Sequence, residues 1–161
     1  MSVRVRADQK LEFPFEKIKD VKSIRKSIDR IGFNLTCLNL AHNQIFEISD
    51  FLPLTCPNLT ILNLAHNKIY MVTNSIGDFK KLEILNLSFN RIEVLPKTFG
   101  NLVQLNHLDL SWNKLVDEAL HENFFQLRTL ERLYLCDNFL TKIGAEFGKF
   151  GNLKILAVRS V

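Results

Sequence analysis

The sequence predicts an α/β solenoid, in which a curved parallel sheet forms the concave face and short helical, 3-10 or irregular segments form the convex face. Three observations predict this fold class. A pattern of four aliphatic residues and one asparagine recurs five times. The asparagines follow one another at intervals of 24, 23, 23 and 25 residues. Each copy also contains a short alternation of apolar and polar residues, which is typical of a strand with one buried face.

The clearest copy of the pattern reads Leu105, Leu108, Leu110, Asn113 and Leu115. Leu108 and Leu110 point to one side of a short strand, because side chains alternate along a strand. We expect the amide of Asn113 to bond backbone groups of the tight curve that follows, which an aliphatic side chain cannot do. One copy cannot bury its own leucines, so the copies must stack.

Together the copies match L-x-x-L-x-L-x-x-N-x-L, the signature of a leucine-rich repeat solenoid. We expect one domain, with an N-terminal cap over residues 1–34, five repeats over 35–152 and a truncated sixth repeat over 153–161. The other four copies are Leu35, Leu38, Leu40, Asn43 and Ile45; Leu59, Leu62, Leu64, Asn67 and Ile69; Leu82, Leu85, Leu87, Asn90 and Ile92; and Leu130, Leu133, Leu135, Asn138 and Leu140.

Composition and charge narrow the class of protein. The chain has 161 residues, of which 47% are hydrophobic, and this is enough to bury an elongated core. The net charge of +4 is concentrated in the first thirty residues, so we interpret it as local and expect no nucleic-acid partner. No run is long and apolar enough to insert into a membrane, and the start is too polar for a signal peptide. The three cysteines form no paired cap, which favours a reducing, cytoplasmic compartment.

The segment before the first repeat has a different pattern. Val3 and Val5 alternate with arginines, a weak strand signal that stops at Pro14. From Phe15 to Ile31, apolar residues recur at three and four residues with basic residues between them, which predicts an amphipathic helix. We favour a capping helix that covers the first repeat over a basic helix that binds a membrane surface or calmodulin.

The convex side should carry a second wall of apolar residues. Leu95, Phe99 and Leu102 lie five, nine and twelve residues after Asn90. This spacing predicts a turn of helix or 3-10 helix rather than a strand. The fourth repeat is shifted by two residues, so an insertion enters around 116–119, either as tolerated surface or as a contact loop. The unshifted offsets of five, nine and twelve residues after the repeat asparagine also hold for Val72, Ile76 and Phe79, and for Ile143, Phe147 and Phe150.

The last repeat is incomplete. Leu153, Leu156 and Val158 begin it, and the expected asparagine would fall at Val161. A fragment, a variant product or a second chain that covers this end would each explain the interruption. We expect an uncovered end to fray or to self-associate, because it exposes apolar side chains and a strand edge.

The exposed strand positions form ladders on the concave face and are the candidate site. The ladder just before the asparagines places Phe89 beside Trp112, with Arg132 and Tyr134 on the next strand. Aromatic and arginine side chains on an exposed face are typical of a binding hot spot. The alternative for the asparagines of the ladders is that they and the histidines satisfy one another across strands. The candidate partner-binding residues are Asn63, His66, Asn86, Phe89, Asp109, Trp112, Arg132, Tyr134 and Asp137.

No residues predict a catalytic, metal or cofactor site. His42, His66 and His107 lie on different repeats without a close pair of ligands. His107 and Asp109 form a conceivable acid–base pair, but an open sheet implies no pocket around them. Phosphate loops and nucleophile elbows are absent from the sequence. We therefore expect a protein that is not an enzyme and needs no cofactor.

The region from Leu95 to Asn138 resembles the Ras suppressor family of cytosolic leucine-rich repeat proteins. The resemblance is carried by the two-residue insertion, by Asn123-Phe124-Phe125, and by Leu133-Tyr134-Leu135 followed by Asp137-Asn138. It covers roughly 59–156, and the chain departs from the family pattern at both ends. The resemblance implies an adaptor at integrin-based cell–matrix adhesions that binds a PINCH-type LIM-domain adaptor and influences Ras and MAP-kinase signalling. The matching concave positions are Asn86, Phe89, Asp109, Trp112, Tyr134 and Asp137.

Two other functions are compatible with a repeat surface. One is a regulatory or scaffold subunit that brings a phosphatase or kinase to its substrate. The other is ribonucleoprotein binding, which only the positive charge favours. The concave ladders carry few lysines or arginines, so nucleic-acid binding is the weaker alternative.

Overall fold

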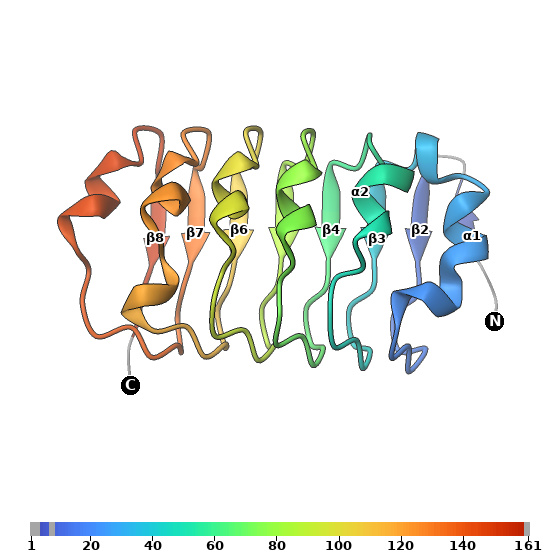
Figure 1. Ribbon diagram of the computed structural model, residues 1–161, viewed down its shortest axis with the longest axis horizontal. Helices are drawn as coiled ribbons and strands as arrows, with labels where there is room; N and C mark the ends of the chain where they lie inside the picture. Colours follow the sequence, from blue (N-terminus) through green and yellow to red (C-terminus); the bar gives the residue numbers. More distant parts are fainter. Residues whose placement is uncertain (1–3, 7–8, 160–161) are drawn as a thin grey trace.

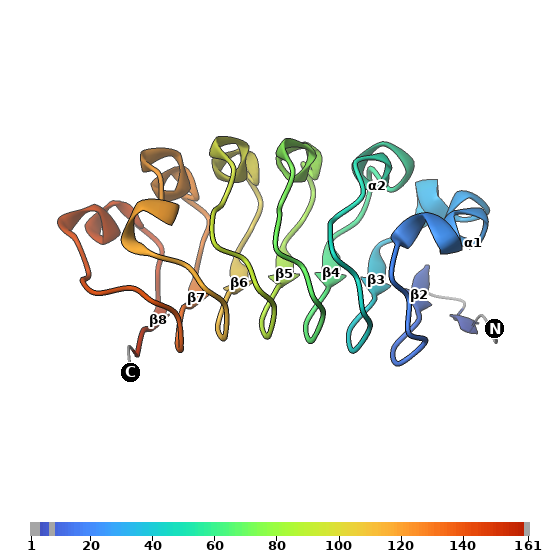
Figure 2. The same cartoon turned by 60° about the horizontal axis from the view of Figure 1, so that its bottom comes forward.

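The computed structural model describes residues 4–6 and 9–159. These residues form one row of repeating units, with strands on one side and short helical segments on the other (Figures 1 and 2). The strands make a single sheet in chain order, parallel from β2 to β8, with β1 antiparallel to β2 at the edge. They are β1 (Arg4–Arg6), β2 (Lys10–Glu12), β3 (Cys37–Asn39), β4 (Ile61–Asn63), β5 (Ile84–Asn86), β6 (His107–Asp109), β7 (Arg132–Tyr134) and β8 (Ile155–Ala157).

The pairing register confirms the predicted stacking of the repeats. Leu62 of β4 faces Leu85 of β5, and Leu108 of β6 faces Leu133 of β7, so equivalent residues always pair. From β2 to β6 the central residue of each strand is buried and both flanking residues are half-buried. This is the alternation that the repeat pattern predicts, and the leucine-rich repeat solenoid is confirmed.

The convex side carries the predicted short helices instead of strands. Leu95, Phe99 and Leu102 are buried, and Phe99 lies within the 3-10 helix η4 (Lys97–Asn101). In these repeats the predicted second wall therefore joins the strand leucines in one hydrophobic core. The fifth repeat corrects the prediction in part: Phe150 is buried, but Phe147 is only partly buried and Ile143 is 48% exposed. The helical segments are η1 (Val21–Ile24), α1 (Arg25–Asp29), η2 (Gly32–Asn34), α2 (Phe51–Thr55), η3 (Asn74–Asp78), η4 (Lys97–Asn101), η5 (Asp117–Ala119), η6 (Glu122–Gln126) and η7 (Ala145–Lys149).

The N-terminal segment corrects the predicted helix over Phe15–Ile31. Helical structure begins only at Val21, after Asp20, whose side chain accepts from the Lys22 amide. Residues 11–18 instead continue the repeat: Leu11 pairs with Leu38, and the Ile18 amide donates to Asn43 Oδ1 at 2.9 Å. These bonds to the first full repeat hold residues before Val21 out of a helix. The weak strand signal is confirmed at Val5 in β1, and Val3 lies outside the described residues.

The capping segment still buries the apolar residues that predicted it. Ile18, Val21, Ile24 and Ile28 are all in the core. Figure 1 shows α1 at the N-terminal end of the row, beside β2. Among the described residues, no helix is long and apolar enough to cross a membrane.

Candidate protein-binding surface

The residue just before each repeat asparagine lies in a left-handed turn. The sequence prediction placed these residues on the concave face of the strands, and the structure corrects this: each lies three residues beyond the end of its strand. Their amides donate to the following repeat, as from His66 to Ser88 and from Phe89 to Ser111, both at 3.0 Å. We call these residues, together with Phe15 at the equivalent position before Glu16, the turn ladder. Its φ angles are 63° at Phe15, 57° at His42, 55° at His66, 54° at Phe89, 57° at Trp112 and 56° at Asp137.

Five members of the turn ladder form a continuous stack of rings. The centroids are 4.4 Å apart for Phe15 and His42, 4.2 Å for His42 and His66, 4.1 Å for His66 and Phe89, and 5.2 Å for Phe89 and Trp112. All four interplanar angles lie between 9° and 14°. The side-by-side placement of Phe89 and Trp112 is therefore confirmed. The histidines of this stack lie against aromatic rings, and no group of residues in the described chain has the arrangement of a metal site.

The N-terminal end of the stack consists of two residues that the sequence analysis did not select as candidates. Phe15 occupies the turn-ladder position of the segment that begins at Leu11, and His42 that of the first full repeat. The spacing between Leu11 and Phe15 is the same as that between Leu38 and His42, and it is the signal that would have found Phe15. Glu16 stands where the repeat has asparagine, which obscured this copy.

The polar residues that end the strands have a local structural role. Oδ1 of Asn63 accepts from the Ala65 amide at 3.1 Å, and Oδ1 of Asn86 from the Ser88 amide at 2.9 Å. Asp109 accepts from the Ser111 amide in the same way, also at 2.9 Å. Each of these bonds reaches the amide two positions later and turns the chain toward the left-handed residue three positions later. The alternative prediction was that the asparagines and histidines of the ladders bond to one another across strands. Asn63, Asn86 and Asp109 instead accept hydrogen bonds from amides of their own repeats.

A second group of candidate residues lies on the strands themselves. The rings of His107 and Tyr134 have centroids 5.4 Å apart, and Arg132 is the direct partner of His107 in the β6–β7 register. Burial lowers the pKa of His107, and the Arg132 charge lowers it further. His66 of the turn ladder also has a lowered pKa, chiefly because of burial and then because of His42. Both imidazoles are therefore held toward their neutral forms.

The turn ladder changes character at its last described member. Asp137 stands where the five preceding members of the turn ladder have an aromatic or imidazole ring. Its Oδ1 lies 3.3 Å from Nη2 of Arg159. A surface hollow of about 680 Å³ opens beside it, lined by Trp112, Asp137, Phe139 and Leu140 among others. Phe139 and Arg159 were not among the predicted site residues. Neither belongs to a regular repeat position that the sequence marks as exposed and aromatic.

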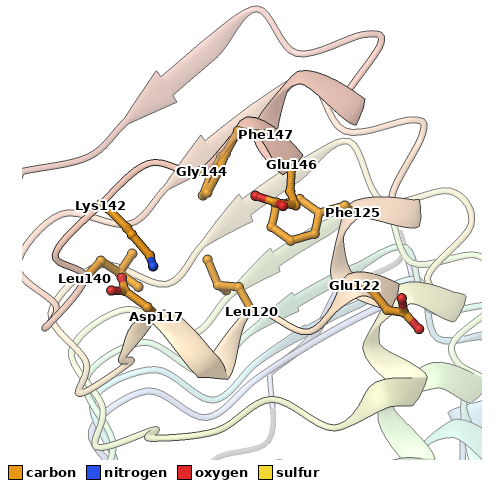
Figure 3. A pocket seen from close by; sticks show the side chains of 9 residues that line it. All are labelled: Asp117, Leu120, Glu122, Phe125, Leu140, Lys142, Gly144, Glu146 and Phe147. Carbon is orange, nitrogen blue, oxygen red and sulfur yellow. The ribbon is translucent and has the colours of Figure 1, made fainter.

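The two-residue insertion of the fourth repeat forms the wall of a second hollow, of about 310 Å³. Figure 3 shows Asp117 and Lys142 at one end of it and Phe125 and Phe147 toward the other. Asp117 accepts from the Thr141 amide at 3.0 Å and from its hydroxyl at 2.5 Å. These bonds lower the pKa of Asp117 and fasten the inserted η5 to the following repeat.

Comparison with known proteins identifies the repeat type. A family model described as leucine rich repeat matches residues 33–92 and 73–115, and together these matches span more than half of the chain. None of the curated proteins searched matches the chain.

Several solved structures have the same architecture. A leucine-rich repeat protein of Leptospira interrogans is 30% identical, with a TM-score of 0.79 over 88% of this chain and 34% of its own. An internalin of Listeria monocytogenes is 26% identical, with a TM-score of 0.72 over 90% of this chain and 39% of its own. The ectodomain of the Arabidopsis thaliana receptor kinase GASSHO1/SCHENGEN3 is 28% identical, with a TM-score of 0.70 over 82% of this chain and 16% of its own. The chain thus spans less than two fifths of each of these proteins.

Proposed function

The chain belongs to the leucine-rich repeat family, and from this premise we propose that it is a non-enzymatic protein-interaction module whose binding surface is centred on Phe89 and Trp112. Leucine-rich repeat proteins generally mediate protein–protein interaction. The similar plant ectodomain was solved in complex with CASPARIAN STRIP INTEGRITY FACTOR 2. The rigid, repeated backbone would present side chains to a partner without reordering on binding.

One observation carries this proposal. Phe89 and Trp112 are 41% and 49% exposed, although they are large rings in a chain that buries most of its apolar residues. They are also fixed in place, because Phe89 stacks on His66 and Trp112 stacks on Phe89, and each backbone amide bonds to the next repeat. Rigid, exposed aromatic rings lose little conformational entropy on binding and are typical of hot spots. We include the remaining candidates in the proposed surface: Asn63, His66, Asn86, Asp109, Arg132, Tyr134 and Asp137.

The partner that we propose is a LIM-domain adaptor of the PINCH type. This proposal rests on the resemblance of residues 95–138 to the Ras suppressor family, which implies a cytoplasmic adaptor at integrin adhesions with an influence on Ras and MAP-kinase signalling. The insertion at 116–119 and the Tyr134 and Asp137 positions support it, because a generic repeat does not require them. It is a narrower proposal than the protein-interaction role and has a separate test.

The test is calorimetric titration of residues 1–161 with the last LIM domain of a PINCH-type adaptor. We expect saturable binding that Trp112→Ala weakens at least tenfold, since loss of a central aromatic anchor costs about 2 kcal/mol or more. The matched control is Leu54→Ala, which removes another exposed apolar side chain from α2 on the convex side and should leave binding unchanged.

The outcomes separate the two levels of the proposal. Binding that Trp112→Ala retains would place the interface outside the turn ladder. Absence of binding by folded protein would exclude the LIM partner while leaving the interaction surface to be tested with other proteins. Circular dichroism of both variants establishes that they are folded.

A further inference from the structure

We propose that the hollow beside Trp112 receives an arginine side chain of the protein partner, whose guanidinium stacks on the open face of the indole and pairs with Asp137. The inference rests on the proposed function, because it names what the partner presents to that surface. It concerns the point at which the aromatic stack of the turn ladder ends.

Within residues 4–6 and 9–159, a ring stacks on only one face of the Trp112 indole, and this residue is 49% exposed. Phe89 covers that face of Trp112, with nearly parallel rings at 5.2 Å. The next turn-ladder member along the row is Asp137, and the Trp112 amide bonds to the adjacent residue, Cys136, at 2.8 Å. The free face of the indole is therefore directed toward a position where the repeat would place a further ring but the chain has a carboxylate.

The space at that position suits a flat cationic group. The hollow has a volume of about 680 Å³ and is lined by Trp112 and Asp137, with Phe139 beside them. Phe139 is 63% exposed, so a second ring borders the space. The Asp137 side chain is only 9% exposed, which limits the solvation of its charge. A carboxylate next to an open aromatic face attracts a cation through both charge pairing and the ring quadrupole.

The chain's own arginine already shows the pairing. Arg159 lies 3.3 Å from Asp137 Oδ1, yet its side chain is 72% exposed. Its position in the repeat is occupied by small residues elsewhere, as at Ser88 and Ser111. An ion pair whose cation is this exposed contributes little free energy. A partner arginine that also stacks on Trp112 would therefore displace Arg159.

Arginine fits this site better than lysine. The guanidinium is planar, so it stacks on an indole face while it donates hydrogen bonds to a carboxylate within its own plane. Successive rings of the stack are 4.2 Å and 4.1 Å apart, which is close to the spacing of neighbouring strands. The space beyond Trp112 is therefore wide enough for one more planar group, such as a guanidinium. A lysine ammonium is a strongly hydrated point charge and would use only the carboxylate.

The test is a titration of ¹⁵N-labelled protein, residues 1–161, with acetyl-Gly-Arg-Gly-amide, followed by NMR. Trp112 is the single tryptophan of the chain, so its indole N–H gives one unambiguous signal. We expect a saturable shift of that signal with the arginine peptide. The matched lysine peptide should bind several times more weakly and the neutral citrulline peptide about tenfold more weakly, because charge and planarity both contribute.

Two variants test the role of each charge. Asp137→Asn should weaken the arginine peptide about tenfold, and asparagine tolerates the left-handed backbone at this position. Arg159→Ala should strengthen binding severalfold, because it removes the internal competitor. Lys154→Ala is the matched control, since Lys154 is another exposed cation of the last repeat, paired with Glu131 at 2.9 Å, and its removal should change nothing.

Three results would overturn the inference: an indole signal that does not move, a citrulline peptide that binds as well as the arginine peptide, or an Asp137→Asn variant that binds like the parent. The dispersion of each spectrum shows that the variant is folded. The peptide titration and the LIM-domain titration are separate experiments. If the protein binds the LIM domain but not the arginine peptide, only the arginine site is rejected. Peptide binding without LIM binding would reject only that partner.

Discussion

At the scale of single residues, the two histidines with lowered pKa values couple folding to pH. Burial disfavours the charged imidazole of His66 and of His107, so the unfolded chain takes up these protons at higher pH than the folded chain. Stability therefore rises with pH across this range. The stability that the two neutral imidazoles contribute is fully present above their pKa of about 6.5 in the unfolded chain. It is lost as the pH falls through their lower pKa values in the folded chain.

We expect His66→Phe to reduce this pH dependence. Phenylalanine already occupies the same left-handed position at Phe15 and Phe89, so the variant should keep the ring stack. The melting temperature of the parent should fall between pH 7.5 and pH 5.5, and that of the variant should fall less. Thermal unfolding followed by circular dichroism at both pH values checks this. A variant whose melting temperature drops as far as that of the parent would contradict it.

Single residues also show what the sequence could and could not predict. The role of the repeat asparagine is confirmed: Asn113 donates to Leu110 O at 3.0 Å and to Leu87 O at 2.9 Å, and accepts from the Ile92 amide at 3.0 Å. The left-handed turn before it was missed, because His, Phe and Trp do not mark that conformation as glycine does. Hydrogen bonds between repeats, which no single copy reveals, impose it.

At the scale of elements, the convex helices pack closely only where a glycine lies between them. Gly77 of η3 and Gly100 of η4 come ten residues after their repeat asparagines. A Cβ at Gly77 would overlap Thr98 O of η4, and one at Gly100 would overlap Asn123 O of η6. In the shifted fourth repeat the equivalent residue is Phe125, which contacts Phe147 at 5.3 Å between ring centroids. This ring lies between η6 and η7 and lines the hollow in Figure 3.

We expect Gly100→Ala to destabilise the protein by about 1–3 kcal/mol, because the added methyl group meets backbone that cannot move away cheaply. Gly148→Ala is the matched control. Gly148 has the same place in its repeat, but an added Cβ has no atom within 4 Å. Urea denaturation should show a loss for the first variant and no loss for the second. Equal losses of stability in the two variants would mean that the close approach of η4 and η6 does not require glycine at position 100.

The helices also mark where periodicity stops being informative. The offsets from each asparagine predicted the convex helices, because the apolar wall repeats with the strands. The capping segment has no such partner, and its three- and four-residue spacing suited both a long helix and a repeat turn followed by a short helix. The bonds of Ile18 and Phe13 to Asn43 decide between them. These bonds join residues at least 25 positions apart, beyond the reach of a local pattern.

At the scale of the whole molecule, the cost of a core substitution depends on its place in the row. Leu108 is 0% exposed between two neighbouring strands, whereas Leu156, at the same repeat position in β8, is 39% exposed. Each repeat contacts only its neighbours, so an internal residue stabilises two interfaces and a terminal one stabilises a single interface.

We therefore expect Leu108→Ala to lower the free energy of unfolding by about 2–5 kcal/mol and Leu156→Ala to lower it by less than about 1 kcal/mol. Chemical denaturation of both variants measures the difference. Similar losses would show that β8 is covered in solution, for example by a second copy of the chain. Sedimentation at two concentrations would then identify the self-association that an exposed last repeat favours.

The asparagine bonds also give the row a direction. Asn67 donates to Leu40 O and accepts from the Ile45 amide, and Asn90 does the same for Leu64 and Ile69 of the repeat before it. Each repeat therefore has its backbone completed by the one that follows in sequence. During synthesis the N-terminal repeats leave the ribosome first. A newly emerged repeat remains unfinished until its successor arrives, and translation itself then sets the order of assembly.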